Sequence, residues 1–200
     1  MLGKINVWPL IRDHLDTFAP ARGGKRLKWD YCLFYCFPAL IALFLTFGVG
    51  PMRSKYVDFL LLAQTIFIPL MVNVVFLIHS IKQSSRAKPC PASPGEQVNV
   101  VAAEAAAARA VKSQALLDAI YKNVSYSILM SMFSVLALGS TKLVGLPTPF
   151  AINESALATF NLVAVPVLYF TIYFLLSHIF ITGLMILKRT HVLLTDEFAT

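Results

Sequence analysis

The chain has 200 residues, of which 58% are hydrophobic and 14% are charged, and its formal net charge is +7. Soluble domains of this length carry about a quarter charged residues, so this composition excludes an ordinary water-soluble fold. The polar residues fall into short pieces that are too small to bury separate cores, so a single domain is expected.

Residues 1–30 form a basic segment that we expect to lie in the cytoplasm. Four cations gather at Arg22, Lys25, Arg26 and Lys28. They suit either a stop-transfer anchor against anionic lipid or a site for an anionic ligand. The segment shows no apolar core of a cleavable signal, so the first membrane span is expected to act as its own insertion signal.

Four runs without Asp, Glu, Lys or Arg follow, and they predict four membrane-spanning helices. They are residues 31–52, 59–81, 123–141 and 155–187. A helix needs about 20 apolar residues to cross the hydrocarbon core, and each run meets that length. The first two spans, in residues 31–81, are joined by a short connection and are expected to pack as a tight antiparallel hairpin. Residues 123–187 would form a second hairpin.

Polar and helix-breaking residues mark the first two spans. Pro38 lies near the start of the first span, and Gly50 with the proline after it is expected to end that span. In the second span Asn73 lies four residues after Pro69 and therefore on the same helix face. An amide in hydrocarbon needs a partner, so Asn73 is either an interhelical hydrogen-bonding residue or a residue with a direct role in transport.

Residues 82–122 change character along their length. A proline-rich linker occupies residues 82–97, and an alanine-rich stretch without Pro or Gly follows from about residue 98. Alanine is the strongest helix former, so one long helix is expected to run through Lys122 into the third span. Its 25 residues before the span would project about 37 Å into the cytoplasm. Its apolar face needs cover from another copy, a partner or the membrane surface, and self-association is favoured.

The third span carries a row of small polar residues. Asn123, Ser127, Ser131 and Ser134 recur at helical spacing, and Leu138 lies further along the same face. Such a row either packs closely against other helices or lines a water-filled passage. In the second case Leu138 would close the passage by dewetting.

The fourth span has more apolar length than it needs, so its outer end is placed near residues 162–167, after a loop and a possible short helix. His178 then falls near the middle of the membrane. An ionisable residue at that depth is a functional candidate, although a neutral imidazole bonded to a neighbouring Asn or Ser is an equal alternative. The tail, residues 188–200, is expected to continue this helix on the cytoplasmic side.

The basic residues predict the orientation. Of the 17 Lys and Arg residues, 14 lie in the two end segments and in the connection between the second and third spans, and 3 lie in the other two connections. Basic segments stay in the cytoplasm, so both termini are expected there.

No enzyme motif or metal-ligand spacing is found in the sequence, so we expect no catalytic residue, no metal and no cofactor. Cys32, Cys36 and Cys90 are too few and too scattered for a disulfide framework and are expected to be reduced. No carboxylate lies inside a span, which argues against an ion-coupled transporter.

Several stretches carry a resemblance to a known family. They are the run from Lys28 to Pro38, Thr65-Ile-Phe-Ile-Pro with Asn73, Asn123-Val-Ser-Tyr-Ser-Ile-Leu, and Leu184-Met-Ile-Leu-Lys-Arg-Thr-His-Val-Leu-Leu. Together they resemble small four-span membrane effectors of bacterial anti-phage defence systems, first the Hailong-type channel effectors and second the Kiwa membrane subunit. The resemblance implies a tetrameric channel of the bacterial inner membrane, opened by a nucleotide-derived messenger from a partner enzyme.

These observations lead to two functional hypotheses. In the first, several copies form a ligand-gated pore that depolarises the membrane, with Asn123, Ser127, Ser131, Ser134 and Leu138 as its lining. The anionic messenger, an oligonucleotide or nucleotide, would bind the cytoplasmic cations Arg22, Lys25, Arg26, Lys28, Arg109 and Lys112. In the second, the protein is a non-conducting scaffold or sensor that docks a soluble partner through residues 82–122.

Overall fold

A computed structural model describes residues 7–17, 32–86, 100–143 and 154–198. Every regular element in these ranges is helical, and four helices are long and apolar enough to cross a membrane. The prediction of an all-α protein with four membrane spans is therefore confirmed.

The first span is built from three helical segments, and the other three spans are single helices. In chain order the elements are α1 (Trp8–Asp16), the first span with η2 (Cys32–Cys36), α3 (Phe37–Phe44) and η3 (Leu45–Val49), then α4 (Ser54–Arg86), α5 (Val100–Leu143) and α6 (Glu154–Phe198). The four candidate spans cover residues 32–49, 54–84, 107–142 and 162–193.

The first span departs from a regular α-helix at both ends. The segments η2 and η3 are π-helical, and Pro38 stands in the first turn of α3, where a missing N–H is tolerated. Gly50 ends the span with φ +77°, a backbone conformation that glycine adopts readily. Its carbonyl accepts a hydrogen bond from Tyr173 Oη at 3.1 Å. The prediction that the span ends at Gly50 is confirmed.

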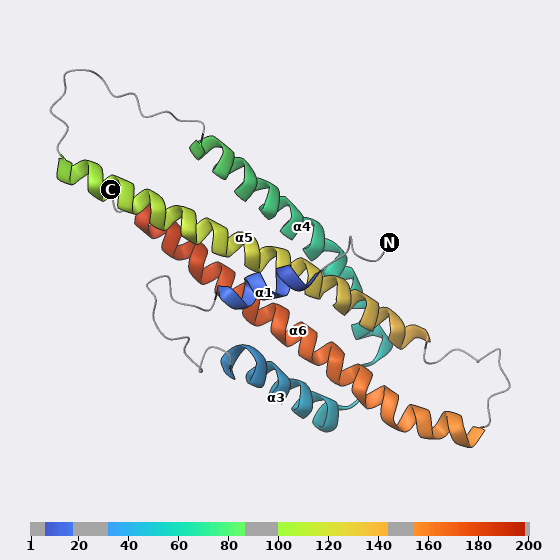
Figure 1. Ribbon diagram of the computed structural model, residues 1–200. Coiled ribbons are helices and arrows are strands. Elements are labelled where there is room, and N and C mark those ends of the chain that lie inside the picture. Colours follow the sequence, from blue (N-terminus) through green and yellow to red (C-terminus); the bar gives the residue numbers. More distant parts are fainter. Residues whose placement is uncertain (1–6, 18–31, 87–99, 144–153, 199–200) are drawn as a thin grey trace.

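The spanning helices lie in a row in the order α3, α6, α5 and α4, with the long helices side by side (Figure 1). In the described parts of the chain, α4 contacts α5 alone and α3 contacts α6. The prediction that the first two spans pack as a tight hairpin is therefore wrong.

A row of mainly small residues explains why α3 packs on α6. The buried residues of the first span, Phe34, Pro38, Ala42 and Thr46, recur every four positions and form one stripe. Small side chains let membrane helices approach closely, whereas the buried residues of α4, Val57, Gln64 and Ile78, are larger and lie seven or more positions apart. The short connection to α4 therefore links neighbours in sequence that are not neighbours in space.

Two apolar clusters hold α4, α5 and α6 together, one toward each end of these helices. One consists of Ile78, Leu117, Ile120 and Val124, and the other consists of Val57, Leu138 and Ile172. Near the first cluster Lys82 forms an ion pair with Asp118.

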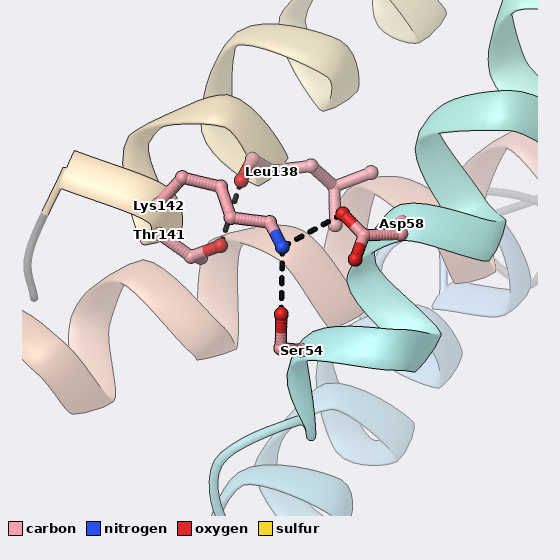
Figure 2. Close-up of polar contacts among 5 residues, drawn as sticks. All are labelled: Ser54, Asp58, Leu138, Thr141 and Lys142. Carbon is pink, nitrogen blue, oxygen red and sulfur yellow. Dashed lines mark hydrogen bonds and ion pairs between the residues drawn. The ribbon is translucent and has the colours of Figure 1, made fainter.

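Beside the second cluster, Lys142 of α5 reaches across to α4 (Figure 2). Its Nζ lies 2.7 Å from Asp58 Oδ1 and 2.7 Å from Ser54 Oγ. Both charged side chains are well exposed, so this pair contributes at most about 1 kcal/mol. The buried clusters therefore fix how α4 lies on α5.

Helices α5 and α6 are each continuous over more than the thickness of a bilayer. The prediction of one helix leading into the third span is confirmed by α5, although its cytoplasmic location stays a prediction. Helix α6 begins at Glu154 and runs through Pro166, so the separate short helix expected before the fourth span is absent from residues 154–198. A proline within a membrane helix is tolerated when neighbouring groups satisfy the freed carbonyl.

Candidate functional site

A buried polar cluster lies where α1 packs on α5, beside His178 of α6. Figure 1 shows α1 lying over the long helices. We call His14, Thr17, Asn123, Tyr126 and His178 the histidine cluster. The side chains of His14 and Asn123 are fully buried, and His178 is 1% exposed. Buried polar groups are stable only when they are hydrogen-bonded, so the contacts within this cluster decide how the chain is held together.

His178 is fixed by a proline on another helix. Pro38 has no N–H, so the carbonyl of Phe34, four residues earlier, lacks its usual helical donor. His178 Nδ1 lies 3.0 Å from that carbonyl oxygen and donates to it. Since a carbonyl only accepts, Nδ1 carries the hydrogen and Nε2 of the neutral ring is an acceptor.

Tyr126 supplies the matching donor from α5. Its Oη lies 3.0 Å from His178 Nε2, so the phenol O–H donates to the imidazole. His178 is therefore satisfied at both ring nitrogens by Phe34 and Tyr126. For a neutral His178 we expect a neighbouring Asn or Ser from the sequence, and the partners are instead a tyrosine and a backbone carbonyl.

His14 anchors α1 on the bundle. Its Nδ1 lies 2.8 Å from Asn123 Oδ1, and its ring stacks on Tyr126 with centroids 3.8 Å apart and an interplanar angle of 5°. Thr17 adds a second hydrogen bond to Asn123 Oδ1, at 3.0 Å. The amphipathic helix α1 and the Thr17 that follows it are thus held against Asn123 of α5 by two hydrogen bonds.

The pKa of His14 is lowered from 6.5 to about 4. Burial is the main cause, the hydrogen bond to Asn123 opposes it, and the nearby His178 and Arg189 add to the lowering. The charged form loses its hydration when the ring is buried, so the neutral ring is preferred. His14 is therefore neutral while α1 is seated at neutral pH.

Arg189 closes the cluster on the side of α6. Its Nη2 donates to the carbonyl of Thr17 at 2.7 Å, which holds the last turn of α1. Its Nη1 is buried and has no hydrogen-bond partner within the described part of the chain. A guanidinium has five N–H donors, so capacity for a further acceptor remains.

The polar row predicted on the third span exists, and it lies inside one protomer. Asn123, Ser131 and Ser134 are fully buried, and Ser127 is 1% exposed. Leu138, also fully buried, packs with Val57 and Ile172. A pore on an axis between copies would need this row on the outer surface, so the present arrangement does not provide such a lining. A pore role for these residues stays a prediction that requires another arrangement of the helices.

The other predicted site residues are not brought together. Asn73 is exposed on α4, whereas His178 is buried on α6. Arg109 and Lys112 are exposed on the first half of α5. The remaining cations of the predicted ligand site lie outside the described residues: Arg22, Lys25, Arg26 and Lys28.

Sequence reasoning missed His14, Thr17 and Tyr126. The one available signal was that His14 interrupts a short amphipathic segment that begins with Trp8 and Pro9. Nothing in the sequence places that segment against residue 123, because the contact joins positions 109 residues apart.

The cluster does not have the composition of a metal centre. Within residues 7–17, 32–86, 100–143 and 154–198, no three His, Cys, Asp or Glu side chains are grouped so that they could hold an ion. The two histidines are engaged with an amide, a phenol and a carbonyl. These hydrogen bonds join the first span, α1, α5 and α6.

The row of apolar helices defines a multi-pass membrane protein with four candidate spans. No family model, no curated protein and no solved structure matches the chain.

Proposed function

We propose that this protein is a self-associating membrane scaffold that docks a soluble partner outside the bilayer. The observation that carries the proposal is the burial of the polar row inside one protomer. A row of small polar residues that is turned inward leaves no lining for a passage between copies.

Both ends of the polar row are closed by packed side chains. At one end Asn123 is bonded to His14 and Thr17 of α1. At the other end Leu138 is fully buried against Val57 and Ile172. The bonds of Asn123 to α1 are of the interhelical kind, which contributes about 0.6 to 2 kcal/mol each in membranes, and the small serines allow the helices to approach closely.

Residues 107–112 of α5, which precede the uncharged run 123–141, offer the docking surface. Residues 107–112 are exposed, and Val111 is 69% exposed. Alanine-rich sequence keeps this segment helical. Lys112 lies beside Val111 around the helix, whereas Arg109, two residues earlier, lies on the opposite side and adds to the positive charge of this segment. The surface is therefore complementary to a partner helix with an apolar stripe and an acidic rim.

An exposed amide on α4 supports association between copies. Asn73 lies about 4.5 Å along the helix from the centre of the second apolar run. It is surrounded by Leu70, Phe76 and Leu77, which are 56%, 67% and 60% exposed. A polar side chain on a lipid-facing helix is most stable when a second membrane helix supplies a hydrogen-bond partner.

A second candidate function is gated conduction, and one observation favours it. Within the described part of the chain, Ser127, Ser131 and Ser134 have buried hydroxyls without a hydrogen-bond partner. Other hydroxyls of the same helices, such as Ser140, donate to the carbonyl four residues earlier. Water along the three serines would satisfy them, and a nucleotide-derived signal in a defence system would then act by unseating α1.

Ion flux separates the two functions. For a scaffold, liposomes that contain the purified protein are expected to release ions no faster than empty liposomes. The same result is expected for Leu138→Ser, which removes the apolar side chain that closes one end of the polar row. Under conduction, Leu138→Ser would raise flux and adding Ser131→Leu would abolish it. Adding Ser140→Leu instead is the matched control, because Ser140 lies outside the buried row. Flux with that pattern would overturn the scaffold.

Docking is tested by a photo-crosslinking phenylalanine analogue placed at Val111 in cells. We expect a discrete protein adduct whose crosslinked peptide carries an acidic amphipathic helix, and its loss when Arg109→Glu and Lys112→Glu are combined. The control position is Leu136, which is 66% exposed on the membrane-spanning part of the same helix. Absence of a protein adduct at position 111 would contradict a docking role for α5.

A further inference from the structure

An open groove lies between the first span and residues 181–192 of α6. Its volume is about 520 Å³, which is within the range of small-molecule sites. Its walls are mainly apolar and include Leu33, Phe37, Ile181 and Leu184. Leu33, Phe37 and Leu184 are also 55%, 49% and 51% exposed, so the groove opens sideways toward the surrounding lipid.

Two basic residues also line the groove. Lys188 and Arg189 line it and directly follow the uncharged run that ends at residue 187. Basic residues at such a boundary lie at the level of the lipid headgroups. Arg189 donates through Nη2 to the carbonyl of Thr17, while its buried Nη1 has no acceptor within the described residues.

We propose that this groove binds one anionic phospholipid. Its phosphate contacts Lys188 and Arg189, and one acyl chain follows Ile181 and Leu184. A guanidinium is well suited to phosphate because it donates in a fixed fork geometry. A free phosphate would leave the apolar walls unfilled, and a zwitterionic lipid would place its own cation against the two basic residues.

Lipid binding would be linked to the packing of α1 on α5. Thr17 and Phe34 line the groove, and they also belong to or contact the histidine cluster. A lipid phosphate that engages Arg189 therefore strengthens the end of α1 that Arg189 holds. This lipid site does not depend on whether the protein conducts ions or docks a partner.

Native mass spectrometry of the full chain, released from detergent with defined lipids, tests the proposal. We expect one phosphatidylglycerol per chain to be retained, with little retention of phosphatidylcholine. Lys188→Gln is expected to weaken retention about fivefold, as one basic residue near an anionic surface contributes about that much. Ile181→Trp, which fills the groove, is expected to abolish it.

Matched controls keep the test falsifiable. Arg109→Gln removes a cation outside the groove, and Val163→Trp adds the same ring at an exposed position of α6. Both are expected to retain the lipid as the wild type does. Equal retention of phosphatidylcholine, equal loss in all four variants, or a thermal shift with inorganic phosphate alone would overturn the site.

Discussion

At the scale of single residues, the histidine cluster is organised by complementary donors and acceptors. Pro38 leaves the Phe34 carbonyl without its helical donor, His178 supplies that donor, and Tyr126 satisfies the other ring nitrogen. His14 Nδ1 is likewise paired with the side-chain oxygen of Asn123. Each contact joins residues from different helices. A change at the His178 ring would therefore affect the packing of α6, α5 and the first span.

Acidification should release α1 from its packing on α5. The pKa of His14 is about 4 when buried and 6.5 in its ordinary state, so the unseated state binds more protons as the pH falls below 6.5. The seated state therefore loses about 1.4 kcal/mol per pH unit between pH 6.5 and 4, and its stability is unaffected by this group above pH 6.5. Hydrogen exchange of residues 8–17 measures this loss.

The matched controls for acidification are two histidine variants. His14→Gln removes the titrating group and should make exchange in α1 independent of pH over that window, after correction for intrinsic rates. His79→Gln changes an exposed histidine of α4 and should leave the dependence intact. A pH dependence that survives in His14→Gln would mean that another group controls α1.

At the scale of elements, the packing of each helix follows from its buried face. The first span contacts α6 through a stripe of mainly small residues, and α4 contacts α5 through Val57 and Ile78 near its two ends. Between residues 59 and 77, the exposed positions of α4 are apolar apart from Thr65 and Asn73. That face is where a second copy is expected to bind.

Replacing the exposed amide of α4 should weaken self-association. We expect Asn73→Leu to cost about 0.6 to 2 kcal/mol per contact in lipid, because the interhelical hydrogen bond is lost. Energy transfer between labelled copies in liposomes measures this self-association. Thr65→Val is the control, since the Thr65 hydroxyl donates to the carbonyl of Leu62 on its own helix. Association unchanged by Asn73→Leu would place the contact elsewhere.

At the scale of the whole molecule, four spans and the distribution of basic residues predict that both termini lie on one side. With Cys32, Cys36 and Cys90 replaced by serine, Arg53→Cys should react with an impermeant maleimide in intact cells. Arg109→Cys should react only after the cells are permeabilised. The reverse pattern would invert the molecule and place the lipid groove in the other leaflet.

The sequence by itself determined the number of spans, the helical class and the continuity of α5, because these depend on the length of uncharged runs and on local propensity. It also identified the inward face of α5, since Asn123 and the three serines recur at helical spacing. Whether that face meets water, lipid or protein depends on neighbours, and helical spacing is the same in each case.

The tertiary structure alone decided which helices are neighbours and what the polar residues do. It placed α3 on α6 in spite of the short connection to α4, and it brought His14 to Asn123 and the Phe34 carbonyl to His178. These partners are separated by 109 and 144 residues. Periodicity describes one helix at a time, whereas the free energy of a buried polar group depends on the atoms that other helices place beside it.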